Sequence, residues 1–195
     1  MNKKMPVLFI GHGSPMNAVL NNEYTEAISK STQNIPKPEA ILVISAHWET
    51  EGTFITSSDE PEQIYDFYGF PEELYNLKYK PTGSKKYAQM VAAELKDSNV
   101  MLTEKWGLDH GAWSVLSHLY PKAEIPVFQM SLNKLGNEQY HYDLGRKLSI
   151  LREKGILIIG SGDIVHNLGR MDYDMNVTPF EWASEFDNYI CDAIV

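Results

Sequence analysis

The fold follows from the stretch Val7-Leu8-Phe9-Ile10-Gly11-His12-Gly13-Ser14-Pro15, in which a short apolar run leads into a turn that carries a histidine. Such a run, bounded by glycine, serine and proline, is typical of a buried strand in a parallel sheet. Three further runs of this kind, each followed by Gly, Ser, Asn or His, occupy residues 40–44, 127–130 and 156–159. Ligands of open α/β sheets bind beyond the carboxyl ends of the strands. We therefore expect the residues that follow these runs to gather at one edge of one sheet.

Helical patterns separate the expected strands, because apolar residues recur three and four positions apart between the runs. The residues that define four helices are, in chain order, Tyr87, Met90, Val91 and Leu95; Trp113, Leu116 and Tyr120; Tyr140, Leu144, Leu148 and Leu151; and Trp182, Phe186, Tyr189 and Ile190. Residues 51–81 are rich in Tyr, Phe, Pro and Gly without a clear period, so we expect a long functional loop there. The sequence thus predicts an α/β protein with a central, mostly parallel sheet flanked by helices.

Length, charge and cysteine content limit the class of protein. A chain of 195 residues is expected to form one domain over residues 1–195. The net charge of −9 offers no basic stripe for phosphates, so we expect no nucleic-acid partner. The apolar runs are too short to span a bilayer and the N-terminus lacks a signal peptide, so we expect no membrane partner. Cys191 is the only cysteine; it reads as a small buried hydrophobe, and the lack of disulfides favours a cytoplasmic location.

The last amphipathic pattern continues to Val195 without a glycine, a proline or a charged cap. We interpret this as a catalytic-type domain that is truncated at its C-terminus. The apolar side chains of the last helix would then face water. Because exposed apolar patches promote association, we expect this chain to form a homo-oligomer.

Two histidines follow two of the strand runs in the same way. His12 lies between two glycines, which let the backbone approach a ligand closely, and His47 follows residues 40–44. The alternatives are that His12 caps a helix and that His47 is a core histidine. If both lie at one sheet edge, they are candidate metal ligands, because neutral imidazole is a common ligand of zinc and iron.

Two further histidines lie at the start of expected helices. His110 belongs to Trp106-Gly107-Leu108-Asp109-His110-Gly111, in which the alternative interpretation makes Asp109 a helix N-cap. His166 follows Gly160-Ser161-Gly162-Asp163, whose spacing fits neither a dinucleotide fingerprint nor a Walker loop. A histidine that opens a helix beside metal-binding imidazoles is placed to act as an acid or a base. We therefore take His166 as a candidate acid or base, and His110 as a candidate functional residue.

Five short motifs run in order along essentially the whole chain. They are residues 6–17, with Gly11-His12-Gly13-Ser14-Pro15; residues 44–48, with His47-Trp48; residues 65–75, with Tyr65-Asp66-Phe67-Tyr68-Gly69-Phe70-Pro71; residues 107–113, with Asp109-His110-Gly111; and residues 160–168, with His166-Asn167-Leu168. In these motifs the chain resembles the class III extradiol ring-cleavage dioxygenases, in the branch of the DOPA 4,5-dioxygenase-like proteins. Five motifs in register are a far more specific signal than any single Gly-His-Gly.

The resemblance implies an Fe(II) site, or a Zn(II) site as in some members, that opens a catechol ring next to its two hydroxyls with O₂. The partners it implies are a small aromatic diol and O₂. By the motifs, His12 and His47 correspond to metal ligands, and His110 and His166 correspond to residues that orient the reactants and move protons. The residues expected to line the substrate pocket are Ser14, Trp48, Tyr65 and Phe70. The family's third metal ligand, a histidine, lies in a C-terminal segment that this sequence does not contain, so weak metal binding is expected.

Two other functions use the same residues. A metal-poor binding or scaffold protein on the same fold is one alternative, because only two ligands are assigned by the motifs. A zinc-dependent hydrolase is the other, because the same imidazoles would serve to activate water on zinc. The metal that is bound after anaerobic purification distinguishes the three.

Overall fold

The computed structural model describes residues 4–172, 174 and 177–194 of the chain. The chain divides into two compact units, Met1–Gly162 and Asp163–Val195. The first unit contains the sheets and most of the helices, and the second contains a short 3-10 helix and the last α-helix. The expectations of one domain over residues 1–195 and of a truncated C-terminus stay predictions.

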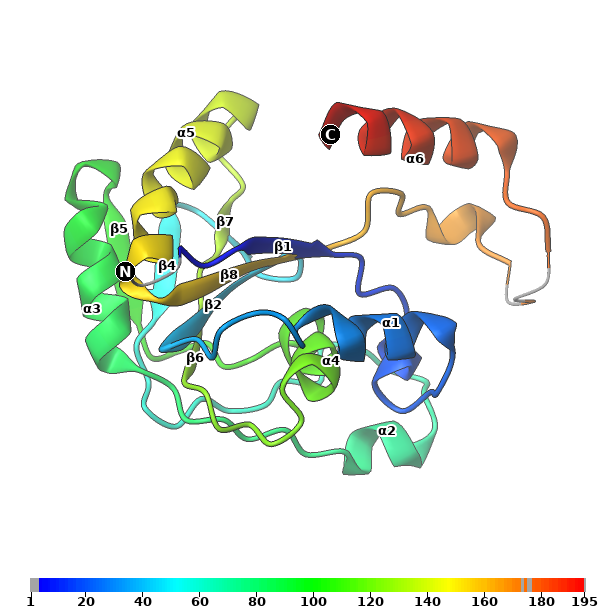
Figure 1. Cartoon of the computed structure of the whole chain (residues 1–195), viewed down its shortest axis with the longest axis horizontal. Coiled ribbons are helices and arrows are strands. Elements are labelled where there is room, and N and C mark those ends of the chain that lie inside the picture. Colours follow the sequence, from blue (N-terminus) through cyan, green and yellow to red (C-terminus); the bar gives the residue numbers. More distant parts are fainter. Residues whose placement is uncertain (1–3, 173, 175–176, 195) are drawn as a thin grey trace. The chain divides into compact units, whose positions relative to one another are not determined.

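Four parallel strands form the central sheet of the first unit in the order β1-β8-β2-β6 (Figure 1). Their bounds are Val7–Ile10 for β1, Ile156–Ser161 for β8, Ala40–Ser45 for β2 and Val127–Gln129 for β6. The four apolar runs of the sequence are thus the four strands, and the predicted α/β class is confirmed. Ser161 of β8 is in register with both Ile10 and Ser45, so three of the strands end at one edge.

Helices cover both faces of this sheet. One face packs against α1 (Glu23–Ser31) and α4 (His110–Leu119), and the other packs against α3 (Lys85–Glu94) and α5 (Glu138–Leu148) (Figure 1). Successive side chains of a strand point to opposite faces, so a strand that is covered on both sides must be apolar throughout. This is why the inner strands β2 and β8 read as continuous apolar runs, with the described core residues from 40 to 43 and from 156 to 159 buried.

The remaining elements of the first unit are short. They are η1 (Pro15–Ala18), β3 (Glu49–Thr50), β4 (Thr53–Thr56), α2 (Glu72–Asn76), η2 (Lys96–Ser98), β5 (Val100–Thr103), β7 (Leu132–Asn133) and η3 (Ser149–Lys154). β3 pairs with β7 and β4 pairs with β5, both in parallel. The expectation of an unbroken loop over residues 51–81 is therefore wrong in part, because β4 and α2 lie within it. Four or five residues are too few to show a period that separates a strand or a helix from a loop.

The second unit contains η4 (Leu168–Arg170) and α6 (Glu181–Ile194). Three of the four apolar side chains of its stripe are exposed, namely Trp182, Phe186 and Tyr189. Ile190 is half-buried, and Cys191 is exposed, so the expectation of a buried cysteine is wrong. Cys191 follows the stripe directly, which places it on another side of the helix. In the described part of the chain, no helix combines the length and the apolarity that crossing a bilayer requires.

Candidate metal centre

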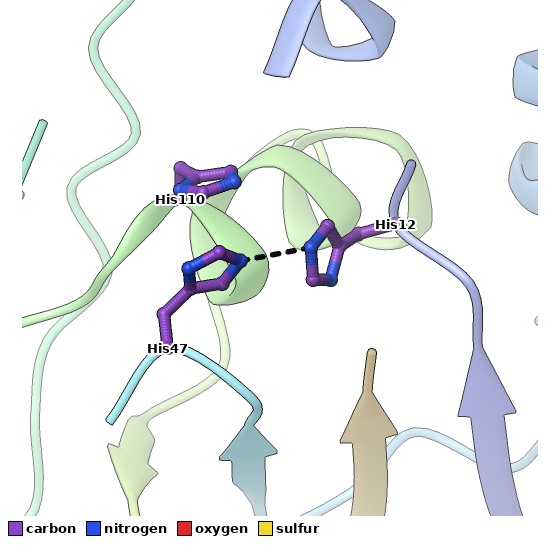
Figure 2. Close-up of side chains that lie close together, drawn as sticks. All are labelled: His12, His47 and His110. Carbon is purple, nitrogen blue, oxygen red and sulfur yellow. Dashed lines mark hydrogen bonds between the residues drawn. The ribbon is translucent and has the colours of Figure 1, made fainter. Parts of the chain in front are cut away.

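His12 and His47 meet beyond the carboxyl ends of two strands that flank β8. Each histidine comes two residues after its strand, β1 or β2, and the last residues of these strands are both in register with Ser161. Because the two strands end level with each other, equal offsets from their ends bring the two rings to the same distance beyond the edge of the sheet. Their Nε2 atoms are 2.9 Å apart and share a hydrogen bond, which Figure 2 shows as the dashed line between the two rings.

His110 joins this pair from the first turn of α4. Its ring centroid lies 4.0 Å from that of His47 and 5.3 Å from that of His12. One nitrogen from each of the three rings falls within 4.8 Å of the others, and we call this group the three-histidine cluster (Figure 2). His12 and His110 are each 4% exposed, whereas the side chain of His47 is 28% exposed. The cluster is therefore buried on two sides and reaches solvent beside His47.

The start of α4 is held close to the sheet edge by two local features. Asp109 caps the helix by accepting a hydrogen bond from the backbone N–H of Ala112, so the N-cap interpretation of this residue is correct. A Cβ atom on Gly111 would lie 2.5 Å from Ser45 Oγ, so glycine lets the helix approach β2 without displacing this side chain. The buried Gln129 side chain donates to Asp109 Oδ2 and ties the cap to β6. These contacts bring His110 to the strand ends.

The Ser161 hydroxyl fixes the protonation pattern of His12. Ser161 Oγ lies 2.6 Å from the Gly111 carbonyl oxygen and 3.0 Å from His12 Nδ1. A hydroxyl has one hydrogen, and a carbonyl can only accept, so the hydroxyl donates to Gly111 and accepts from His12 Nδ1–H. His12 is then the tautomer whose Nε2, facing His47, has the lone pair that a metal needs. The sequence shows the Gly-Ser-Gly turn after β8, but nothing in it indicates this role of Ser161.

One carboxylate contacts the other two rings of the cluster. Asp66 Oδ1 lies 2.9 Å from His110 Nδ1 and accepts a hydrogen bond from the His110 backbone N–H, and Asp66 Oδ2 lies 3.4 Å from His47 Nδ1. Burial raises the pKa of the Asp66 carboxyl, but the hydrogen bonds and the charge of His110 outweigh burial and hold this pKa below its ordinary value. Asp66 is a site residue that the sequence analysis missed. Its position inside the aromatic motif of residues 65–75 was the available signal.

Two of the residues expected to line a substrate pocket have evident structural contacts. Trp48 is 4% exposed and stacks in parallel on Trp106, with ring centroids 5.6 Å apart. Ser14 is exposed and caps η1 by accepting a hydrogen bond from the Met16 backbone N–H. Trp48 thus supports the turn that carries His47, and Ser14 starts the helix that follows His12.

The aromatic motif packs beside the cluster through Phe67. The Phe67 ring stands edge-on to the His110 ring, with centroids 5.4 Å apart. Tyr65 and Phe70 both pack against Phe67, and the Tyr65 hydroxyl donates to the Leu77 carbonyl. Tyr65 and Phe70 therefore support the ring that contacts the cluster, and Phe67 is the neighbour of His110 that the sequence analysis did not single out.

His166 belongs to the second unit, in the exposed stretch between β8 and η4. It is not a member of the three-histidine cluster. Its expected catalytic role stays a prediction.

Comparison with known proteins assigns the class. The family model described as the catalytic LigB subunit of aromatic ring-opening dioxygenase matches residues 6–194. The chain belongs to this family of extradiol ring-opening dioxygenases, which confirms the resemblance drawn from the five motifs.

Named relatives and a solved structure agree with this assignment. The chain is 43% identical over 188 residues to the 4,5-DOPA dioxygenase extradiol of Escherichia coli K12, an alignment that covers 96% of this chain and 69% of that protein. It is 41% identical to the 4,5-DOPA dioxygenase extradiol of Beta vulgaris, with 93% of this chain and 70% of that protein covered. The crystal structure of an uncharacterized protein from Escherichia coli K12 superposes with a TM-score of 0.82 at 39% identity, and covers 96% of this chain and 72% of that one.

Proposed function

We propose that this chain opens the ring of a catechol-type substrate with O₂ at a non-haem metal held by His12 and His47. The observation that carries the proposal is the 2.9 Å separation of their Nε2 atoms. Two imidazoles that bind one ion at right angles, each at about 2.1 Å, have nitrogens about 3.0 Å apart. The donor pair therefore fits a divalent metal with little movement of either ring.

His110 is proposed to handle a proton and orient the substrate. One nitrogen of each of the three rings lies within 4.8 Å of the others, and the five motifs match His110 to a residue that orients the reactants and moves protons. The His12–His47 pair has ligand spacing, and His110 stands beside it. With Asp66 next to its Nδ1, the His110 ring is suited to accept a proton from a substrate hydroxyl, because the carboxylate stabilises the resulting imidazolium.

Fe(II) is the proposed metal. When bound, it would supply a centre that holds both catechol oxygens and O₂ and passes charge between them. Zinc has no redox chemistry, so it suits a hydrolase better than a reaction with O₂. The protein's own contribution is to hold the Nε2 atoms of His12 and His47 at ligand spacing, to keep His110 beside the bound substrate and to bury His12 and His110.

The proposed substrate is DOPA or a similar catechol. The support is that several relatives, including those from Escherichia coli and Beta vulgaris, are named for 4,5-DOPA. Ser14, Trp48, Tyr65 and Phe70 are retained as the proposed surroundings of the substrate, and His166 as a second proton-transfer residue. A cytoplasmic compartment is also part of the proposal, because a chain with one cysteine has no internal disulfide to maintain.

The test combines a metal assay with an oxygen assay. The chain is purified anaerobically, its metal content is measured, and O₂ uptake is followed after addition of L-DOPA. We expect bound iron and DOPA-dependent O₂ uptake, both lost in His47→Ala. His141→Ala is the matched control, because His141 contacts the Asn133 carbonyl and does not belong to the cluster. Tightly bound zinc with hydrolytic activity would favour the hydrolase, and a chain that binds neither metal would favour the scaffold protein.

A further inference from the structure

Asp109 and Gln129 form a two-point contact in the interior of the first unit. The Gln129 side-chain amide donates from Nε2 to Asp109 Oδ2 over 2.8 Å, and its Oε1 accepts from the Asp109 backbone N–H over 3.1 Å. Both residues are fully buried, with 0% of their surface exposed. Gln129 is the last residue of β6, and its own backbone N–H donates to Thr56 Oγ1 of β4, so its backbone is fixed at the end of the strand.

Each atom of this contact has a defined role as donor or acceptor. A backbone N–H only donates, so the Gln129 atom that faces the Asp109 backbone is the amide oxygen, and the NH₂ group then faces the carboxylate, which accepts. The other carboxylate oxygen, Oδ1, accepts from the Ala112 backbone N–H and caps α4. A buried polar group that loses its partner destabilises the folded state. Position 129 therefore requires a side chain that offers one donor and one acceptor side by side.

This contact fixes the residue that leads directly into His110. Asp109 is the N-cap of α4, and His110 is the first residue of the helix. β6, which ends at Gln129, pairs in parallel with β2, the strand that leads to His47. The contact thus joins the start of α4 to the sheet that carries His47. The centroids of the His47 and His110 rings lie 4.0 Å apart at this junction.

We propose that Gln129 is a positioning residue that acts through Asp109 and holds the His110 ring in place for proton transfer. The role of His110 rests on the proposed function, whereas the position of its ring does not. Displacement of a reacting group by about 1 Å lowers a rate by about 10²-fold, so a ring that transfers a proton needs such support. If the contact only stabilised the core, the position of the His110 ring would not depend on it.

Two single substitutions each place like groups face to face. Gln129→Glu replaces the NH₂ group with an oxygen, which faces Asp109 Oδ2 as a second acceptor. In Asp109→Asn the oxygen is expected to stay with the Ala112 N–H, so the new NH₂ group faces that of Gln129 as a second donor. Either substitution leaves the contact unmatched, and we expect the first turn of α4 to move away from the end of β6.

The double variant D109N/Q129E exchanges the two groups and restores the match. The carboxylate introduced at position 129 accepts from the amide introduced at position 109 and from the backbone N–H of the same residue. The oxygen of the new amide still caps α4. The net charge equals that of the parent, so the exchange is expected to recover what each single substitution loses.

The first readout is the position of the His110 ring, and it needs neither metal nor turnover. The Phe67 ring stands edge-on to His110 with centroids 5.4 Å apart, close enough for nuclear Overhauser contacts between the ring protons. We expect these contacts in the parent and in D109N/Q129E, and their loss in D109N and in Q129E. Leu148→Ala is the control, because it opens a cavity in the core on the other face of the sheet and so lowers stability without moving the ring.

The second readout is the rate of DOPA-dependent O₂ uptake per bound iron. D109N and Q129E are expected to lower kcat by about 10²-fold and to change KM less, because a displaced proton-transfer group affects the chemical step. D109N/Q129E is expected to return kcat toward that of the parent, and Leu148→Ala to keep it. If the parent takes up no O₂, the proposed function fails, and the ring contacts still decide the role of Gln129.

Folded single variants that keep the contacts between His110 and Phe67 would overturn the proposal, as would an exchange variant that folds without restoring them. If Q129E does not fold, Gln129→Met takes its place, because it keeps the length of the side chain without adding a charge. If D109N does not fold either, the exchange variant decides alone. A folded chain with the ring contacts restored then supports the proposal, and a chain that stays unfolded refutes it.

Discussion

At the scale of single residues, the site consists of three imidazole rings, each of which contacts a polar side chain that is not itself a proposed ligand. His12 faces a serine hydroxyl whose hydrogen is already donated to a carbonyl, and His47 and His110 face a carboxylate. The serine accepts a hydrogen bond from His12 Nδ1–H and so leaves the lone pair of His12 on Nε2, which faces His47. Side chains that never touch a metal therefore decide whether the imidazoles can bind one.

Ser161→Ala tests this at His12. The substitution removes the acceptor of His12 Nδ1–H and the donor of the Gly111 carbonyl, both in buried surroundings. We expect a loss of about 1–3 kcal/mol in the free energy of unfolding, together with weaker Co(II) binding. Urea denaturation and metal titration measure the two effects. Ser149→Ala, at an exposed position, is the control; equal effects of the two substitutions would contradict the assigned role.

His110 and His166 are distinguished from ligands by their effect on metal content. We expect His110→Ala and His166→Ala to retain bound iron and to lower the rate of ring opening by about 10²–10⁴-fold, because general acid–base groups contribute that much. His12→Ala is expected to lose both iron and activity. Metal analysis and O₂ uptake on the same preparations provide the comparison. Loss of iron in His110→Ala would make His110 a third ligand.

At the scale of elements, backbone hydrogen bonds join the two loops that precede Asp66 and His110. This contact positions both residues at the site. The Ile64 and Leu108 backbone N–H groups donate to the carbonyls of Leu108 and Glu62, respectively, across the two loops. Gly107 lies at this contact, where a Cβ atom would be 1.9 Å from the Glu62 carbonyl oxygen. The close approach of the loops therefore depends on a missing side chain.

Gly107→Ala is expected to open this contact. Because the obstructing atom is backbone, the loops must separate, and we expect a loss of about 1–3 kcal/mol in unfolding free energy with a parallel loss of metal affinity. Gly145→Ala is the matched control, since nothing lies within 4 Å of its Cβ position in α5. That control is expected to raise stability by about 0.5–1 kcal/mol. Unchanged metal binding in Gly107→Ala would show that the contact between the two loops does not support the metal site.

At the scale of the whole molecule, metal binding and folding are coupled, because the three rings come from segments far apart in the chain. Only the folded chain presents His12 next to His47, so a metal binds the folded state and stabilises it. At a metal concentration 100 times the dissociation constant, the gain is about 2.7 kcal/mol. We expect the unfolding temperature to rise with added Zn(II) and to return after chelation, in differential scanning fluorimetry. His47→Ala should show no such rise, and a rise as large as that of the parent would argue against the site.

The exposed apolar stripe of α6 is expected to drive self-association. Trp182, Phe186 and Tyr189 are 38%, 43% and 67% exposed, respectively. At about 25 cal/mol per Å² of apolar area, covering a few hundred Å² is worth several kcal/mol. Light scattering after size exclusion is expected to show a mass that rises with concentration, and Phe186→Ser is expected to weaken this rise. A monomer at every concentration would remove the expectation of a homo-oligomer.

The sequence by itself determined the central sheet and the meeting of two histidines. Buried parallel strands must be apolar on both faces, so β1, β2, β6 and β8 could be read from short runs between turn residues. Parallel strands in register bring the residues that follow them to one edge. His12 and His47 therefore had to be neighbours once the strands that precede them flank β8.

Only the tertiary structure decided which groups hold those histidines. Asp66 reaches the cluster from a segment without period, and Ser161 reaches it from the strand between the two ligands. Their partners lie up to 149 residues away in sequence. The local sequence around a hydroxyl or a carboxylate does not show which imidazole that group will contact. The short elements β4 and α2 were missed for a related reason, because their form comes from packing and pairing with distant residues and not from a pattern of their own. Periodicity records which face of an element is buried, whereas hydrogen-bond geometry between distant segments is set when the chain folds.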